Sequence, residues 1–485
     1  MLAVAACLAA IAPKPNIIYI LADDLGYGEL GCYGQKVIQT PNIDQMAREG
    51  MKFTDHYSGS PVCAPARSTF LEGKSTRTNT IRENKEFGDF TATGTEGQFP
   101  LGRGTKTLAW AMKNAGYATG AVGKWGLGGP DSTGQPNKQG FDYYFGYLCQ
   151  RQAHNYYPDH LWENEAKYPL NNPTFNAHQQ FPKNADPNDP ASFDRYRGQV
   201  YSNDVMRDKA LDFIDKNKGG PFFLYVPFTI PHVSLQVPGD SETPYLGKLD
   251  EKPYLGDKGY LPNQHPLSAY AGMISRLDGY VGQILQKLKS DGIDDNTLVI
   301  FTSDNGPTWV SGITPDIFDS THGLRGRKAQ LWEGGIRVPF VARWPGRISP
   351  GSVSHVPSVM YDMFPTFASL AGASVPDGIE GISLVPALTG QGETAKRDYI
   401  YWEFFPHDWG QAVRIGNLKA IRFLNPKSKD AGHMFVYDLA RDPGETADVA
   451  SRHPDFVKRA VSIMASRRDS PYEPWNKPYV SVTTH

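Results

Sequence analysis

Short apolar runs recur along the chain, and four of them are followed by polar residues. The runs span residues 16–21, 117–122, 222–226 and 298–301. They lead, in that order, to Asp23 and Asp24, to Lys124, to His232, and to Asp304 and Asn305. In open α/β sheets ligands bind outside the carboxyl ends of the strands, so we expect these side chains to converge on one site. The competing interpretation is that Asp-Asp and Asp-Asn only form turns or helix caps.

Helical periodicity appears between these runs, at residues 42–50, 201–217 and 267–288, with Ser202 placed to cap the second helix. Residues 150–197 are rich in Pro, Asn and Tyr without a clear period, which predicts a long ordered insertion. The alternation of strands and helices predicts an α/β fold with a large, mostly parallel central sheet flanked by helices.

The pattern changes from residue 397 onward. Short β-rich runs follow at 399–405, 411–415, 418–424 and 434–439, and a helical segment at 455–466. The turn residues Gly416 and Asn417 favour a hairpin. These features predict a smaller C-terminal antiparallel sheet with one helix packed on it. We therefore divide the chain into residues 1–13, an N-terminal domain at 14–390 and a C-terminal subdomain at 391–485.

Composition is that of a folded globular protein, with 485 residues, 40% hydrophobic and 21% charged. The net charge of −2 excludes recruitment of nucleic acid or an anionic membrane by a global field. No run of 18 apolar residues predicts a transmembrane segment. Residues 1–13 are Ala-rich and resemble the later part of a signal peptide, which predicts a periplasmic or secreted protein. A lipobox-like stretch at 4–7 and a mis-set start codon are the alternatives for this segment.

Four cysteines are present, at positions 7, 32, 63 and 149, and none forms a metal-type C-x-x-C pair. Removal of the leader would leave three, and an odd number in an exported protein points to one special thiol. A plain buried cysteine is the alternative for each of them.

The stretch Pro-Val-Cys-Ala-Pro-Ala-Arg at 61–67 resembles the signature of type I, formylglycine-dependent sulfatases, in their arylsulfatase-like branch. The match continues to Gly73, with Glu72 as a minor departure. The resemblance implies an alkaline-phosphatase-like fold over residues 15–471. It also implies that a maturation enzyme oxidises Cys63 to formylglycine before folding is complete. A Cys-His protease or phosphatase is disfavoured, since no matching His or phosphate-loop pattern surrounds Cys63.

The same resemblance implies a calcium site formed by Asp23, Asp24, Asp304 and Asn305 together with the matured Cys63. Carboxylate and amide oxygens are hard ligands, which suit Ca²⁺ better than zinc. The ion would bind a sulfate oxygen and act as a Lewis acid.

The implied catalytic residues besides Cys63 are Arg67, Lys124, His232 and Lys328. Three cations and a metal would neutralise a sulfate ester and its transition state. His232, or Lys328 beside it, would protonate the leaving alcohol. Each of these residues taken alone is more often structural or solvated.

One departure from the family pattern is substantive, because the usual Gly-Lys-x-His reads Gly-Lys-Trp-Gly here, with Gly126 in place of the histidine. In relatives that histidine is the base that drives sulfate release. His154 and His407 are the candidate substitutes, against the alternative that each is structural or binds substrate. Some branches that carry Gly there act on polysaccharides, so loss of activity is not implied.

A sulfated carbohydrate, of the galactose or N-acetylgalactosamine type, is the expected substrate, and a small aryl sulfate is the alternative. Aromatic, basic and amide side chains suited to sugars occur in the insertion, near 404–411 and shortly after the signature. The candidate substrate-binding residues are Arg82, Asn84, Arg151, His154, His407 and Gln411. Two further alternatives are a phosphoester or phosphonate hydrolase of the same superfamily and a non-catalytic glycan-binding relative.

Overall fold

The computed structural model describes residues 14–89, 95–406, 409–470, 472 and 475–476. The predicted signal-peptide remnant at 1–13 lies outside the described residues. None of the helices within these ranges is long and apolar enough to cross a membrane.

A ten-stranded sheet forms the centre of the molecule. Its five middle strands are parallel, in the order β9 (Thr297–Ser303), β1 (Asn16–Ala22), β8 (Phe222–Pro227), β4 (Ala118–Lys124) and β5 (Tyr143–Tyr147). Beyond β9 lie β10 (Phe340–Arg343), β2 (Met51–Phe53) and β11 (Ser352–Ser354), and beyond β5 lie β6 (His160–Glu163) and β7 (Ala166–Pro169). A separate parallel pair joins β3 (His56–Tyr57) to β12 (Ser358–Val359). The four strands predicted from apolar runs, β1, β4, β8 and β9, are confirmed.

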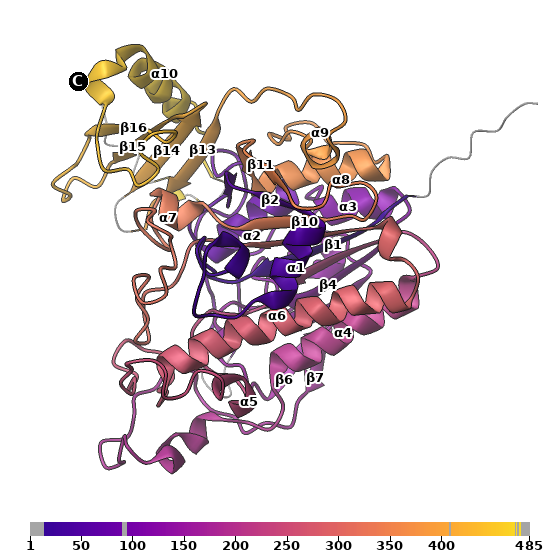
Figure 1. The fold of residues 1–485 in the computed structure, drawn as a ribbon, viewed down its shortest axis with the longest axis vertical. Coiled ribbons are helices and arrows are strands. Elements are labelled where there is room, and N and C mark those ends of the chain that lie inside the picture. The colour runs from indigo at the N-terminus through magenta and orange to yellow at the C-terminus, as the bar shows by residue number, and fades with distance from the viewer. Residues whose placement is uncertain (1–13, 90–94, 407–408, 471, 473–474, 477–485) are drawn as a thin grey trace, which may run out of the picture.

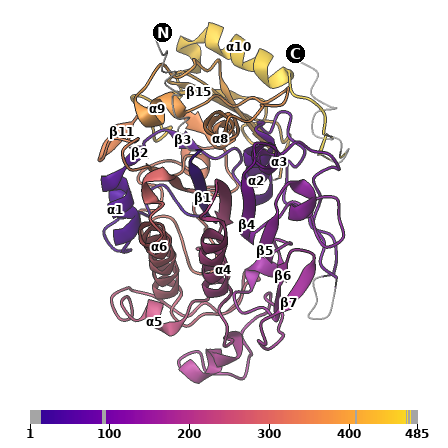
Figure 2. The same cartoon turned by 90° about the vertical axis from the view of Figure 1, so that its right-hand side faces the viewer.

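Helices cover both faces of the sheet (Figure 1). The helices of the described N-terminal part are α1 (Pro41–Glu49), α2 (Cys63–Glu72), α3 (Leu108–Asn114), α4 (Ser202–Asn217), α5 (Gly239–Glu242), α6 (Pro266–Ser290), α7 (Glu333–Ile336), α8 (Met363–Ala371) and α9 (Val385–Thr389). In both views α4 and α6 lie on one side of the sheet and α3 and α8 on the other (Figure 2).

The two faces of β1 show how the sequence builds this sandwich. Ile18 and Ile20 join the buried cluster under α1, α4 and α6, while Ile17 and Tyr19 join the cluster under α2, α3 and α8. All four side chains are 0% exposed. Full burial of an aliphatic side chain stabilises the fold by about 1.5–3 kcal/mol, so both layers hold this strand in place.

The predicted helices at 42–50, 201–217 and 267–288 correspond to α1, α4 and α6. The prediction that Ser202 caps α4 is wrong, because Tyr201 is the N-cap and Ser202 is the first helical residue. The predicted insertion is ordered and contains β6 and β7, a hairpin that extends the sheet edge, and the short 3-10 helix η3 (Gln152–His154).

The C-terminal part forms a four-stranded antiparallel sheet of β13 (Ile400–Phe404), β14 (Gly410–Ile415), β15 (Leu418–Phe423) and β16 (Met434–Asp438), with α10 (Pro454–Ala465) packed on it. This arrangement and the hairpin at Gly416 are confirmed. Trp402 on the opposite face of this sheet packs with Tyr57 and Ile336 in one buried cluster.

A buried ion cluster also joins the two parts. The Lys419 ammonium lies 3.0 Å from Glu333 Oε1 and 2.9 Å from Glu445 Oε1, and all three side chains are 0% exposed. Glu333 is the first residue of α7 and Lys419 belongs to β15, so the cluster fixes the small sheet to the start of α7. The boundary at residues 390 and 391 stays a prediction.

Candidate active site

The carboxyl ends of β1 and β9 place four oxygen-bearing side chains together. Asp23 and Asp24 directly follow β1, and Asp304 and Asn305 directly follow β9, its neighbour in the sheet. The Asp24 amide donates to Asp304 Oδ1 at 3.1 Å, and Asn305 Nδ2 donates to Asp24 Oδ1 at 2.8 Å. All four residues are 0% exposed. The convergence expected from the strand ends therefore occurs here.

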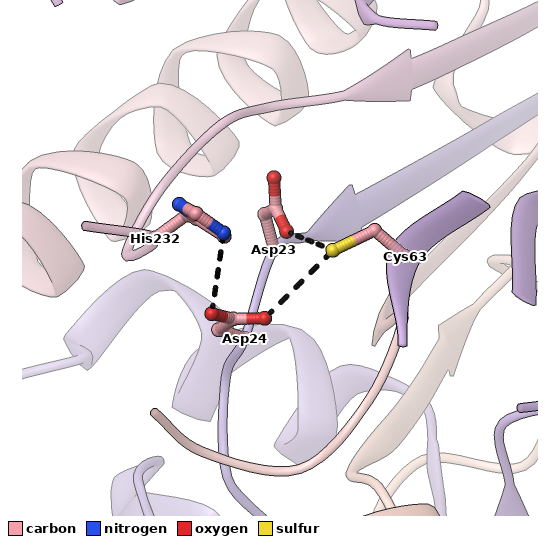
Figure 3. Close-up of side chains that lie close together, drawn as sticks. All are labelled: Asp23, Asp24, Cys63 and His232. Atoms are coloured by element: carbon pink, nitrogen blue, oxygen red, sulfur yellow. Dashed lines mark hydrogen bonds and ion pairs between the residues drawn. The ribbon is translucent and has the colours of Figure 1, made fainter. Parts of the chain in front are cut away.

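Cys63 opens α2 and points at the same carboxylates (Figure 3). Its Sγ lies 3.3 Å from Asp23 Oδ1 and 4.0 Å from Asp24 Oδ1. Burial, followed by the nearby Asp23 charge, raises the pKa of the Cys63 thiol well above its ordinary value. The amide of Ala64 donates to Asn84 Oδ1 at 3.0 Å, so Asn84 satisfies one of the free N–H groups at the start of this helix.

Arg67 lies one turn further along α2 and is 0% exposed. Its Nη2 is 2.8 Å from Asp304 Oδ2 and 3.4 Å from Asp23 Oδ2, and its Nη1 donates to the carbonyl of Lys124. The i to i+4 spacing puts the thiol and the guanidinium on the same face of the helix. The signature motif thus forms the first turns of α2, which place the Cys63 thiol and the Arg67 guanidinium beside the strand ends.

Two lysines complete the charge balance of the site. Lys124 Nζ is 2.6 Å from Asp23 Oδ2, and Lys328 Nζ is 2.7 Å from Asp24 Oδ2. Burial by itself would raise the pKa of Asp23, but Lys124, His232 and Arg67 outweigh it and hold that pKa far below its ordinary range. Three carboxylates therefore face three cations.

His232 follows β8 and turns its ring toward Asp24 (Figure 3), with Nε2 3.6 Å from Asp24 Oδ2. Its Nδ1 donates to the Val233 carbonyl at 2.5 Å, since a carbonyl can only accept. Burial and the charge of Lys328 lower the pKa of His232 to about 4. The neutral ring therefore carries its lone pair on Nε2.

The structure also brings His154 to this cluster. The rings of His154 and His232 stack with centroids 4.9 Å apart at an interplanar angle of 8°. Arg151, three residues earlier, has a side chain that is 43% exposed and lies 3.9 Å from Glu86 Oε2.

Two other predicted substrate-binding residues lie away from the carboxylates. Arg82 is 2% exposed, and its Nη1 is 3.0 Å from Glu403 Oε1 in β13. Gln411 is 0% exposed inside β14, where its Nε2 donates to the Tyr401 hydroxyl at 2.7 Å. Both side chains bind the C-terminal sheet rather than offering polar groups to a substrate. His407 lies outside the described residues.

Position 126 is closed by its surroundings. Gly126 has φ = +78°, and a Cβ there would lie 2.9 Å from Gln150 Cγ. The Gln150 side chain fills the space that a side chain at position 126 would need. Both polar atoms of its amide are buried without a hydrogen-bond partner among the described residues.

Two residues that the sequence did not indicate lie beside His154. His178 Nε2 is 2.9 Å from His154 Nδ1, and the Tyr260 ring lies 5.2 Å from the His154 ring. Both come from loops without a strand end, motif or period. The only sequence signal was the aromatic and polar composition of the insertion around His178.

Comparison with known proteins gives the family. A family model described as Sulfatase matches residues 15–373, and one described as N-sulphoglucosamine sulphohydrolase, C-terminal, matches residues 321–462. The N-acetylgalactosamine-6-sulfatase of Canis lupus familiaris is 33% identical over 424 residues, covering 85% of this chain and 72% of that protein. Arylsulfatase A of Homo sapiens is 32% identical over 514 residues, covering 97% of this chain and 91% of that protein.

Among solved structures, the crystal structure of Ps i-CgsB in complex with k-i-k-neocarrahexaose has a TM-score of 0.77 to this chain. The two chains are 27% identical, over 96% of this chain and 98% of that one. The expected alkaline-phosphatase-like fold is confirmed. The first family model spans well over half of the residues, and it includes the strand ends and the helix of Cys63. This chain belongs to the sulfatase family and is a sulfuric ester hydrolase.

Proposed function

We propose that this protein hydrolyses sulfate esters on a sugar of the galactose or N-acetylgalactosamine type. The observation that carries the proposal is the buried cluster in which Cys63, within the sulfatase signature, faces carboxylates and cations. A relative named N-acetylgalactosamine-6-sulfatase and a similar structure that holds a neocarrahexaose support a sugar as substrate.

The residues at the strand ends fit a calcium ion. Asp23, Asp24, Asp304 and Asn305 supply only oxygen atoms, the donors that Ca²⁺ prefers. Asn305 Oδ1 is buried without a hydrogen-bond partner among the described residues, as expected of an atom kept for a ligand. Ca²⁺ bound there supplies Lewis acidity toward a sulfate oxygen.

The charge balance of the site agrees with this assignment. The three carboxylates and three cations sum to zero, so a divalent cation gives the site a charge of about +2, which attracts an anionic ester and is partly neutralised by it. Lys124, Lys328 and Arg67 stabilise the negative charge on the sulfate group. Lys328 delivers a proton to the leaving alcohol, whereas His232, whose ring is neutral with a bare Nε2, can do so only after it has taken up a proton.

Formylglycine at position 63 is the proposed nucleophile, made from Cys63 by a maturation enzyme. Its hydrated aldehyde supplies two hydroxyl groups, one to attack sulfur and one to release sulfate. Peptide mass spectrometry of the Cys63 peptide after co-expression with such an enzyme tests this directly. A thiol that persists in active protein contradicts the assignment.

Activity assays on matured protein test the reaction. We expect sulfate release from galactose 6-sulfate or N-acetylgalactosamine 6-sulfate, abolished in Cys63→Ala. The phosphate ester of the same sugar is the matched control, and faster cleavage of that ester would favour the phosphoester hydrolase. Cleavage of aryl sulfates alone would remove the sugar from the proposal.

Calcium binding has a readout apart from turnover. Titration of Ca²⁺ into chelator-treated protein should raise its thermal stability, by about 2.7 kcal/mol at a hundredfold excess over Kd. Asn305→Ala should weaken the shift. An equal shift in wild type and variant would place the ion elsewhere.

A further inference from the structure

Three rings form a wall beside His232, and we call His154, His178 and Tyr260 the ring wall. The centroid of His154 lies 5.0 Å from that of His178 and 5.2 Å from that of Tyr260. His178 and Tyr260 are 5.3 Å apart. His154 also stacks on His232, so the ring wall directly adjoins the cluster around Cys63.

Hydrogen bonds fix which nitrogen of His154 carries its proton. Nδ1 of His178 is bonded to the Gly259 carbonyl, which can only accept, so this nitrogen carries a proton. Burial lowers the pKa of His178, which keeps its ring neutral and leaves Nε2 as an acceptor. Nδ1 of His154, 2.9 Å away, must then be the donor. The neutral ring of His154 therefore has a bare lone pair on Nε2.

This lone pair has no use within the protein. Within the described part of the chain, the His154 ring forms its hydrogen bond through Nδ1 and not through Nε2, and the contacts of Tyr260 are those of its aromatic ring. Both side chains are only partly buried, so His154 Nε2 and the Tyr260 hydroxyl can be reached by a ligand, and they lie next to a site that must accept an organic alcohol. Burial, followed by His232 and His178, also holds the pKa of His154 well below its ordinary value, so the ring stays neutral.

We propose that His154 is a specificity-determining residue whose Nε2 accepts a hydrogen bond from a hydroxyl group of the sulfated sugar, with His178 as its positioning residue. The inference rests on the proposed function. A fixed acceptor selects a donor, so a carbonyl or ether oxygen at the same place is rejected by lone-pair repulsion. The Tyr260 ring supplies an aromatic face for the pyranose.

The tautomer is the first test, by ¹⁵N NMR of the histidine rings in unmatured protein without substrate. The ring signals of His154 are assigned as those missing from the spectrum of His154→Phe. We expect them to show a proton on Nδ1 and none on Nε2. His178→Leu removes the acceptor and should mix the two tautomers, whereas His178→Gln keeps a carbonyl acceptor and should restore the wild-type pattern. A protonated Nε2 in the wild type overturns the inference.

The second test measures sugar binding by calorimetry, with calcium present and Cys63 unmatured, so that turnover plays no part. The probes are methyl β-galactoside 6-sulfate and its 2-, 3- and 4-deoxy analogues. The analogue that lacks the hydroxyl bonded to His154 should bind wild type about tenfold to a hundredfold more weakly, because the sugar then covers Nε2 and leaves it without a hydrogen bond. His154→Phe keeps the ring stack and should bind that analogue and the parent sugar equally.

His433→Phe is the matched control, because His433 is exposed and pairs with Asp448 in the C-terminal part. This variant should lose the same factor in affinity between the parent sugar and that deoxy analogue as the wild type does. If no deoxy analogue binds wild type more weakly than the parent sugar does, or if His154→Phe shows the same loss of affinity, the inference is overturned. Sulfate release by matured wild type, measured separately on galactose 6-sulfate and N-acetylgalactosamine 6-sulfate, shows whether the proposed function itself stands.

Discussion

Replacing Lys419 by Met tests the buried ion cluster that joins the C-terminal sheet to the rest of the molecule. The substitution keeps the length of the side chain but removes the ammonium shared by Glu333 and Glu445. Glu333 retains Arg337, whose Nη1 lies 3.5 Å from Oε2, so the unpaired carboxylate is mainly that of Glu445. Above about pH 7, where Glu445 is ionised, breaking a fully buried pair in this way costs about 3–5 kcal/mol, and the cost is smaller at lower pH, where the carboxyl carries a proton.

Urea unfolding followed by tryptophan fluorescence measures the loss, because Trp402 and Trp332 both lie in the apolar cluster through which the C-terminal sheet packs on the rest of the molecule. Lys458→Met is the matched control, since its side chain is 81% exposed and should contribute under about 1 kcal/mol. Adding Glu445→Gln to Lys419→Met removes the unpaired charge and should recover a large part of the loss. Equal midpoints for the two lysine variants would refute the reasoning, and so would a double variant no more stable than Lys419→Met.

Three further predictions concern single positions. Burial, with Lys419 opposing and Glu333 adding, raises the pKa of Glu445 to about 7. Between about pH 4.5 and 7 the folded protein thus keeps a proton that the unfolded chain has lost, so the free energy of unfolding should fall as pH rises through this range. The urea midpoint should vary less with pH over this range in Glu445→Gln than in wild type. Asn84→Ala leaves the Ala64 amide unpaired and should lower the free energy of unfolding by about 1 kcal/mol, whereas an unchanged urea midpoint would show that the amide finds another partner. Gly126→His should destabilise the protein by at least about 1–2 kcal/mol because of its positive φ and the contact with Gln150, without raising turnover, and a more active variant in the sulfate assay would contradict this.

The sequence was sufficient to predict those parts of the site in which a functional side chain directly follows a strand. The buried run of β1 leads into Asp23, and neighbouring parallel strands bring Asp304 beside it, so topology alone predicts the contact. The signature motif identified Cys63 and Arg67 as site residues, but the helix α2 that carries them was not among the predicted helices. These parts of the site depend on regular backbone geometry.

The ring wall and the closure of position 126 depend instead on loops whose paths no local pattern fixes. Tyr260 and His178 meet although 82 positions separate them along the chain, and a bond to the backbone at Gly259 holds His178 in place. Gln411 is the opposite case, a residue that the sequence indicated but that the structure places away from the site. It was predicted to bind substrate because amides suit sugars, but its alternating position in β14 turns it inward, where Tyr401 and Arg422 bind it.

The burial of Cys63 has a consequence for how active protein arises. Its thiol is 1% exposed and packed against Asp23, out of reach of another protein's active site. Under the proposed maturation of Cys63, the converting enzyme must therefore bind the chain before α2 docks on the sheet, in competition with folding itself. Faster folding then lowers the converted fraction, so a variant engineered for rapid folding would gain yield and lose specific activity together.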